Sequence, residues 1–410
     1  MNTIRYSTMN RIKQAMICSI LLLFSQTLFA QKKTINEFTA IDKKALQLPD
    51  SQTTTTSKIS DYIKTNFNTD KEKSRAIFIW IATNIQYDIE NMFAINPQEK
   101  YEDKIAKPLK TKKGVCENYA ALFNDICAKS GIKSYVIEGY TKQNGVINNL
   151  PHAWCAALIE GDWCLLDPTF GSGYVNGGKY YKKINNAYFM AKPSGFIKSH
   201  IPFDYLWQFL NYPITSQEFQ EGKTEINKAK PYFNYIDSIR VYESQNHIDQ
   251  LISSANRIEK NGVKNSLTYN MLQYIKVEIE NDRQNKIVSL YNAASADYND
   301  GINKFNEFVD FRNKQFTPQR ADSDIQQLID AAENKLKEAK AKLEKAKLAQ
   351  INSTDANTTN MVIQFTKAID DTITHITEQQ EWLKVYFSKG KLKRKMMLMG
   401  KVSWFGIPLN

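Results

Sequence analysis

The sequence contains 410 residues, of which 42% are hydrophobic and 24% are charged. This composition excludes an intrinsically disordered chain, and the length gives room for two or three domains. Lysine and arginine outnumber the acidic residues by 54 to 43, which gives a formal net charge of +11. Such an excess favours anionic partners where it is concentrated, but over a long chain it is usually a solvated surface. We expect no nucleic-acid partner, because the sequence carries no nucleic-acid-binding motif.

Residues 1–30 have the pattern of a secretory signal peptide. Cations precede an apolar run at 15–24, and Ala30 stands ahead of a polar stretch. A retained membrane anchor is the alternative, but the run is shorter than the ~20 residues that a membrane span needs. We therefore predict cleavage near Ala30 and export to the periplasm or the medium.

The next residues predict helices at 58–65 and 70–85, followed by a basic, proline-containing loop at 91–113. Another helix is expected to begin at Cys116, run to about Lys129 and stop at Gly131, which supplies the left-handed residue that ends many helices. A thiol on the first turn of a helix lies at the positive end of the helix dipole, where the thiolate is favoured. A plain buried cysteine is the alternative.

A β-hairpin is predicted downstream, turning at Glu160-Gly161. A two-residue turn there pairs residues whose numbers sum to 321, which places His152 opposite Thr169 and diagonal to Asp167, on the same face of the sheet. Taken singly, His152 is explained as a core or surface histidine, and Asp167 as a turn residue. Together with Cys116, they have the chemistry of a nucleophile, a base and a group that orients the base.

These residues resemble the transglutaminase-like superfamily, and its kyphoscoliosis-peptidase-like branch in particular. The resemblance lies in the order of Cys116, the His-Ala-Trp motif at 152–154 and the Leu-Asp-Pro-Thr-Phe-Gly motif at 166–171, with the hydrophobic segment 76–88 upstream. It implies a papain-like fold with Cys116 as nucleophile, His152 as general base and acid, and Asp167 as orienter. In this superfamily an aromatic side chain can help to stabilise the oxyanion. Tyr87 and, less strongly, Trp80 are candidates here, although core packing explains both, and the backbone N–H of Cys116 is a more general donor.

Other candidate ligands receive structural interpretations. Cys155 and Cys164 are diagonal neighbours in the hairpin, so either a disulfide or two buried thiols is expected. We predict no metal and no cofactor, because there is no C-x-x-C pair and His152 is already assigned. His200 precedes Ile201-Pro202 at a chain turn, and we expect it to take no part in the chemistry.

The C-terminal half is predicted to be helical. One helix is expected at 285–315, and a 4-3-4-3 hydrophobic spacing from Ile325 to Ala346 indicates a coiled-coil seam. Its expected partner is the segment 358–387, in an antiparallel hairpin, with dimerisation as the alternative. The predicted fold class is therefore α+β followed by all-α. Its parts are a signal peptide at 1–30, a transglutaminase-like domain at 31–215, a linker at 216–245, a helical domain at 246–388 and a basic, apolar tail at 389–410.

The function that these features favour is that of an exported cysteine peptidase or amidase acting through Cys116, His152 and Asp167. The expected substrate is a protein or peptide, with cell-wall peptide as one candidate, and the helical domain is expected to bind a protein partner. An amine-accepting, cross-linking acyltransferase is one alternative. A catalytically idle module that serves as an envelope assembly or binding platform is another. The sequence does not decide the oligomeric state.

Overall fold

The computed structural model describes residues 37–94, 99–350 and 356–399. The predicted signal peptide and the last residues of the tail, from 400 onward, lie outside the described residues. The chain divides into two compact units: the first comprises Met1–Glu243 with Asn256–Asn270, and the second comprises Ser244–Ala255 with Met271–Asn410. Among the described helices, none is long and apolar enough to cross a membrane.

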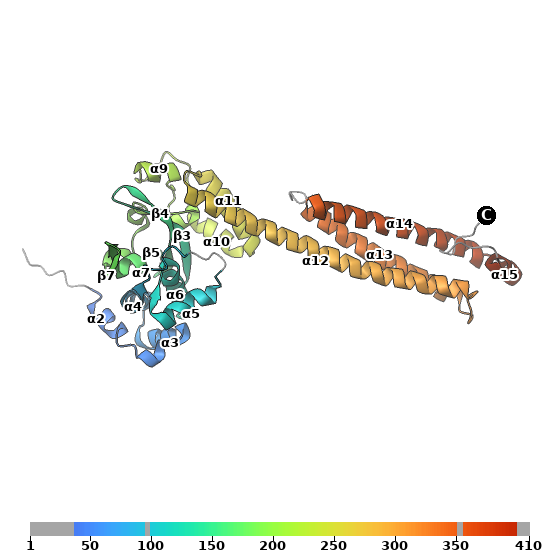
Figure 1. Ribbon diagram of the computed structural model, residues 1–410, viewed down its shortest axis with the longest axis horizontal. Coiled ribbons are helices and arrows are strands. Elements are labelled where there is room, and N and C mark those ends of the chain that lie inside the picture. Colours follow the sequence, from blue (N-terminus) through green and yellow to red (C-terminus); the bar gives the residue numbers. More distant parts are fainter. Residues whose placement is uncertain (1–36, 95–98, 351–355, 400–410) are drawn as a thin grey trace, which may run out of the picture. The chain divides into compact units, whose positions relative to one another are not determined.

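The first unit combines helices with antiparallel strands, as the predicted α+β class requires (Figure 1). Its helices are α2 (Thr39–Ala45), α3 (Thr56–Asn66), α4 (Asp70–Asn84), α5 (Tyr101–Thr111), α6 (Cys116–Lys129), α7 (Pro168–Ser172), α8 (Pro193–Phe196), α9 (Ser216–Glu221) and α10 (Tyr235–Ser244). Its strands are β1 (Gln86–Tyr87), β2 (Lys113–Gly114), β3 (Ser134–Gln143), β4 (Val146–Ile159), β5 (Asp162–Leu166), β6 (Gly173–Asn176), β7 (Lys179–Lys182) and β8 (His200–Pro202).

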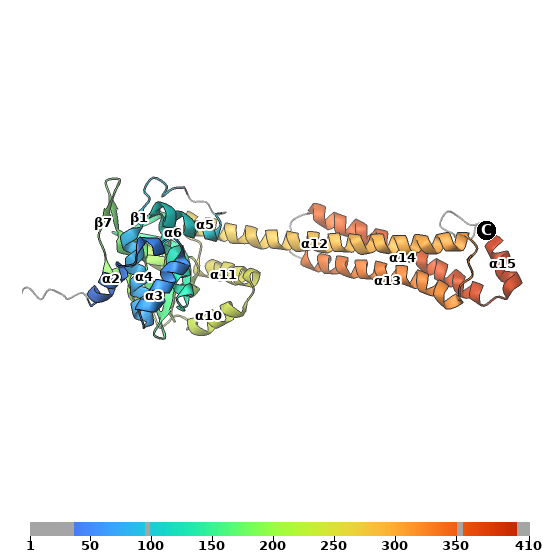
Figure 2. The ribbon, with the colours of Figure 1, turned by 90° about the horizontal axis from the view of Figure 1, so that it is seen from below.

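The central sheet has the strand order β5-β4-β3-β8, with antiparallel neighbours throughout. The hairpin between β4 and β5 turns at Glu160-Gly161 and pairs Cys155 with Leu166, so the predicted register is confirmed. On one face, helix α6 packs against the sheet and α4 packs against α6, around buried residues such as Phe78 and Phe123 (Figure 2). The other face buries Trp154 and Leu165. The packing of α6 on the sheet places the start of this helix next to the strands.

The predicted loop at 91–113 was partly wrong, because residues Tyr101–Thr111 form helix α5. Pro108 lies inside this helix, where a proline lacks the N–H that would bond to the carbonyl oxygen of Lys104. The side-chain Nδ2 of Asn118, in α6, donates to that carbonyl oxygen at 3.0 Å instead. A residue distant in sequence therefore compensates for the proline, which local sequence rules cannot anticipate.

Residues 216–245, which the sequence predicts to be a linker, contain the helices α9 and α10. Ile239 of α10 is buried in the cluster that contains Trp154 and Leu165. Arg257 of helix α11 (His247–Asn261) makes a bidentate ion pair with Asp204, with both N–O distances at 2.7 Å. Residues 216–243 belong to the first unit, as does Asn256–Asn270, which includes Arg257.

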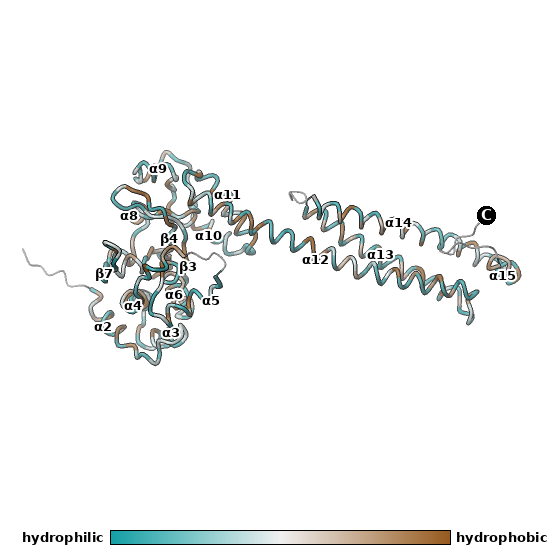
Figure 3. Tube along the Cα trace, viewed as in Figure 1, coloured by the Kyte–Doolittle hydropathy of each residue, from teal (hydrophilic) through white to brown (hydrophobic). Residues whose placement is uncertain are grey.

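The second unit contains α13 (Asp322–Ala349), α14 (Ala356–Phe387), the short helix α15 (Lys391–Met399) and, from Met271 onward, the long helix α12 (Ser266–Asn313). Figures 1 and 2 show the long helices side by side, and Figure 3 shows hydrophilic and hydrophobic residues alternating along them. The predicted hairpin of α13 and α14 is confirmed as antiparallel, since Gln380 contacts Asp330 while Lys340 pairs with Asp370. The predicted seam is buried at all seven positions: Ile325, Ile329, Ala332, Leu336, Ala339, Leu343 and Ala346. Helix α12 begins well before the predicted residue 285.

Candidate active site

Cys116 is the first residue of α6, and its position is fixed by contacts on both sides. Before it, β2 pairs in parallel with β1, and the backbone N–H of Asp88 donates to the carbonyl oxygen of Gly114 at 2.9 Å. After it, the Oδ1 atom of Asn118 accepts a hydrogen bond from the backbone N–H of Val115 at 2.9 Å. A Cβ atom at Gly114 would lie 2.8 Å from the Cβ of Asn118, so only glycine fits there. The thiol is thereby held, half-buried, at the start of the helix.

His152 lies on β4, and its Nε2 atom is 2.7 Å from Oδ2 of Asp167. The predicted pairing of these two side chains is therefore present in the structure. With Nε2 directed at the carboxylate, Nδ1 is the ring nitrogen left to exchange a proton with another group. The Cys116 thiol is among the groups that raise the pKa of the His152 side chain.

Asp167 follows the end of β5 and caps the short helix α7. Its Oδ1 accepts hydrogen bonds from the backbone N–H groups of Thr169 at 2.8 Å and Phe170 at 3.0 Å. The strand pairing ends at Leu166, so Thr169 lies in α7 and does not face His152 in the sheet, which corrects one detail of the predicted register. The capping interaction orients the carboxylate toward His152.

A second histidine, which sequence reasoning set aside, also contacts this carboxylate. Nε2 of His200 lies 3.2 Å from Oδ2 of Asp167, and the His200 side chain is fully buried. Strand β8 brings it there by pairing with β3, where His200 is opposite Thr141. His200 therefore lies within the cluster of predicted site residues, whereas the expectation that it takes no part in the chemistry stays a prediction. A three-residue strand ending in proline has no periodic signal, so the sequence offered little to reveal the pairing.

The charges in this cluster are coupled. Burial alone lowers the pKa of His152, but the Asp167 carboxylate and then the Cys116 thiol raise the pKa of His152, to about 10. Burial opposes ionisation of Asp167, yet the two histidines hold the pKa of its carboxyl well below its usual range. Burial lowers the pKa of His200, and the hydrogen bond to Asp167 offsets only part of this effect. The arrangement favours an imidazolium at His152, a carboxylate at Asp167 and a neutral imidazole at His200.

The two oxyanion candidates differ in position. Trp80 is 2% exposed and belongs to the hydrophobic core, as the packing interpretation predicted. Tyr87 is partly buried at the end of β1, and burial followed by the charges of Cys116 and Asp167 raises the pKa of Tyr87. Its hydroxyl therefore stays protonated and can donate a hydrogen bond.

The four cysteines of the described residues are free thiols, so the proposed disulfide between Cys155 and Cys164 is not formed. Among the described residues, one group has a geometry that could hold a metal ion, namely His152, Asp167 and His200. The hydrogen bonds within this group satisfy the carboxylate without an ion. The expectation that the protein uses no metal remains a prediction.

Part of this chain is similar to known proteins. The family model of the transglutaminase-like superfamily matches residues 57–168. The kyphoscoliosis peptidases of Mus musculus and Homo sapiens are each 34% identical to this chain over 172 residues, which cover 40% of this chain and 25% of theirs. This chain contains a transglutaminase-like domain.

Cys116, His152 and Asp167 all lie within the matched residues 57–168. A solved crystal structure of a TGase is 20% identical, covers 39% of this chain and 40% of its own, and has a TM-score of 0.23. The chain spans about a quarter of the length of the two peptidases, 25% in each case.

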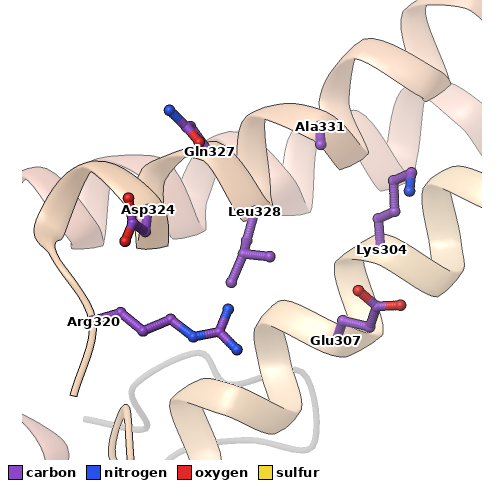
Figure 4. A pocket seen from close by; sticks show the side chains of 7 residues that line it. All are labelled: Lys304, Glu307, Arg320, Asp324, Gln327, Leu328 and Ala331. Carbon is purple, nitrogen blue, oxygen red and sulfur yellow. The ribbon is translucent and has the colours of Figure 1, made fainter. Parts of the chain in front are cut away.

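An open pocket of about 530 Å³ lies in the second unit, between α12 and α13 (Figure 4). Its lining mixes the cations Lys304 and Arg320 with the anions Glu307 and Asp324. No cysteine or histidine lines it, so it offers no thiol or imidazole of the kind found in the first unit.

Proposed function

We propose that the transglutaminase-like domain is an exported cysteine enzyme that attacks amide bonds of a protein or peptide through Cys116, His152 and Asp167. The observation that supports this most directly is the 2.7 Å contact between His152 and a buried Asp167 whose other oxygen is held by two backbone N–H groups. Such an anchored carboxylate fixes the ring of His152 and leaves Nδ1 for the thiol of Cys116.

In the acylation step, the Cys116 thiolate attacks the amide carbonyl carbon, and the carbonyl oxygen becomes an oxyanion. The backbone N–H of Cys116 and the Tyr87 hydroxyl are the donors that we propose for this oxyanion. The C–N bond then breaks as His152 gives its Nδ1 proton to the leaving nitrogen. The products are a free amine and a thioester on Cys116.

In the second step, His152 accepts a proton from the incoming nucleophile, which attacks the thioester while the C–S bond breaks. Water yields a carboxylic acid and makes the enzyme a peptidase or amidase. A primary amine yields a new amide and makes it a cross-linking acyltransferase. We favour hydrolysis, because two of the similar proteins are named peptidases and because water is always available.

The test is the rate at which iodoacetamide labels Cys116, followed by mass spectrometry of its peptide between pH 5.5 and 9. A thiolate paired with the His152 imidazolium should react quickly below pH 7, and the rate there should fall at least about 10-fold in a His152→Ala variant. Cys127 and Cys155 serve as internal controls, because both are fully buried and burial raises the pKa of each thiol. Equal rates in the two proteins below pH 7 would refute the proposal.

The competing function is a binding platform that uses the domain without catalysis, with the helical unit recruiting a protein partner. A Cys116→Ser variant separates the two functions in the cell that makes the protein. An enzyme should lose its biological effect, whereas a platform should keep it. Product analysis with an added primary amine then separates hydrolysis from acyl transfer.

A further inference from the structure

The Asp167 carboxylate has hydrogen-bond partners on all sides. Oδ1 accepts from two backbone N–H groups, and Oδ2 is contacted by Nε2 of His152 at 2.7 Å and Nε2 of His200 at 3.2 Å. A carboxylate offers about four lone-pair positions, so these four contacts saturate it. The proposed triad accounts for only one of the two histidines.

We propose that His200 is a positioning residue, which donates a hydrogen bond from Nε2 to Oδ2 of Asp167 and so fixes the carboxylate that orients His152. This inference rests on the proposed function. His200 does not reach the thiol or the substrate through this contact. It acts on the reaction through Asp167.

The neighbours of His200 determine which of its nitrogens carries the proton. The ionised carboxylate of Asp167 only accepts hydrogen bonds, so a contact with it requires a proton on Nε2. Nδ1 then carries the lone pair, and the Ser199 hydroxyl, whose Oγ lies 2.8 Å away, can donate to it. Both nitrogens of a neutral ring are thereby satisfied. Since burial favours the neutral form, the positive charge stays on His152.

The ring of His200 is also held in place by packing. Phe196 stacks on it with the ring centroids 4.1 Å apart, and Trp154 and Phe170 contact it edge-on at 5.4 and 5.2 Å. The backbones of β3 and β8 also approach each other closely, because a Cβ atom at Gly139 in β3 would lie 2.1 Å from the carbonyl oxygen of Ile201 in β8. A donor that cannot move is suited to fixing the plane of a carboxylate.

The experiment compares two substitutions of His200 in the full-length chain. His200→Phe keeps an aromatic ring for Phe196 to stack on but removes the donor, whereas His200→Gln keeps an N–H donor. The measured quantity is the rate constant for iodoacetamide labelling of Cys116 at pH 6.5, beside wild type and His152→Ala. Groups that hydrogen-bond to the ligands of a metal site and orient them typically contribute about 10- to 100-fold, and we take this range as a guide for His200. We expect His200→Phe to slow labelling at least about 10-fold and His200→Gln to recover most of the rate.

The outcomes separate this inference from the proposed function. If His152→Ala slows labelling and His200→Phe does not, the positioning role is refuted while the proposed function stands. If the two His200 variants lose the rate equally with unchanged melting temperatures, an N–H donor at this position does not restore the rate, and the inference is wrong. If none of the variants changes the rate, both proposals fail.

A second measurement needs no substitution at the site and covers the case in which His200→Phe does not fold. Ring-¹⁵N-labelled histidine distinguishes the two neutral tautomers and the cation by NMR, and the chain has four histidines. His247→Gln and His375→Gln remove the signals of two histidines outside the site, which simplifies the assignment. We expect a neutral His200 protonated at Nε2. A ring protonated at Nδ1, or a spectrum in which a chelator changes the His200 signal, would overturn the inference.

Discussion

At the scale of residues, the pair of His152 and Asp167 contributes to stability as well as to the proposed chemistry. Both side chains are at least nine-tenths buried, and each shifts the titration of the other. A buried ion pair is sensitive to the loss of one member, because the remaining charge is left without compensation. The dependence of this stabilisation on pH follows from the direction of the two shifts.

The pKa of His152 is raised from 6.5 to about 10 in the folded protein, so its contribution is complete below about pH 6.5 and disappears as the pH rises through 10. The pKa of Asp167 is lowered, so its contribution is present above the ordinary value of 3.8 and disappears as the pH falls. The full effect therefore lies between about pH 4 and 6.5. We expect His152→Gln to destabilise the first unit by about 3–5 kcal/mol at pH 6, and by clearly less at pH 9.5.

Scanning calorimetry at both pH values measures this difference. His247→Gln is the matched control, since His247 is exposed and should leave the melting temperature unchanged at either pH. A destabilisation by His152→Gln that is as large at pH 9.5 as at pH 6 would contradict the assignment of the charge to His152.

Sequence reasoning found three members of this cluster and missed the fourth for a physical reason. Helix periodicity predicts the position of Cys116 at the start of a helix. The alternation of side chains in a hairpin, whose turn is visible in the sequence, predicts that His152 and Asp167 share one face. These are local relations. His200 reaches the carboxylate through the pairing of β8 with β3, which joins residues about 60 positions apart and leaves no repeating pattern.

At the scale of elements, the same distinction separates α13 from α5. The seam of α13 was predicted residue by residue, because a heptad repeat determines which side chains face the partner helix. Helix α5 was missed, because Pro108 normally argues against a helix and its compensation by Asn118 comes from another element. Helix α10 lies in the segment predicted to be a linker, and its Ile239 is buried in a cluster with residues distant in the sequence, such as Trp154.

Gly301 gives a test at this scale, because it lets α12 and α13 approach closely. A Cβ atom there would lie 2.9 Å from Cδ2 of Leu336 and 3.3 Å from the carbonyl oxygen of Ala332. We expect Gly301→Val to destabilise the second unit by about 1–3 kcal/mol through overpacking, as measured by calorimetry. The control is Asn299→Val, which places the same β-branched residue at an exposed position of α12. It should change the free energy of unfolding by only a few tenths of a kcal/mol, the size of ordinary differences in helix propensity.

The labelling rate of Cys116 in Gly301→Val tests whether the helices of the second unit influence the candidate site. Gly301 belongs to the second unit and Cys116 to the first, and each unit has its own buried core. We expect the labelling rate at pH 6.5 to stay at the wild-type value. A large loss of labelling would mean that the site depends on the bundle.

At the scale of the whole molecule, the predicted export sets a condition on the proposed chemistry. An oxidising compartment converts paired thiols to disulfides, whereas a nucleophile must stay reduced. Of the four cysteines in the described residues, Cys127 and Cys155 are fully buried, and all four are free in the structure. Cys116 therefore has no disulfide partner in this fold, which is compatible with a working thiol outside the cytoplasm.

We predict that the mature protein begins close to Gln31, after cleavage behind Ala30. Removing residues 1–30 removes three cations and no acidic residue, so the formal net charge falls from +11 to +8 (11 − 3). Cell fractionation followed by N-terminal sequencing and intact-mass measurement checks this directly, and substituting Ala30 by a bulky residue should slow the cleavage because signal peptidases require small residues there. A protein recovered from the membrane with residues 1–30 intact would show that the segment is a retained anchor. The domain would then work at a membrane surface, and substrates fixed to that surface would be the first to examine.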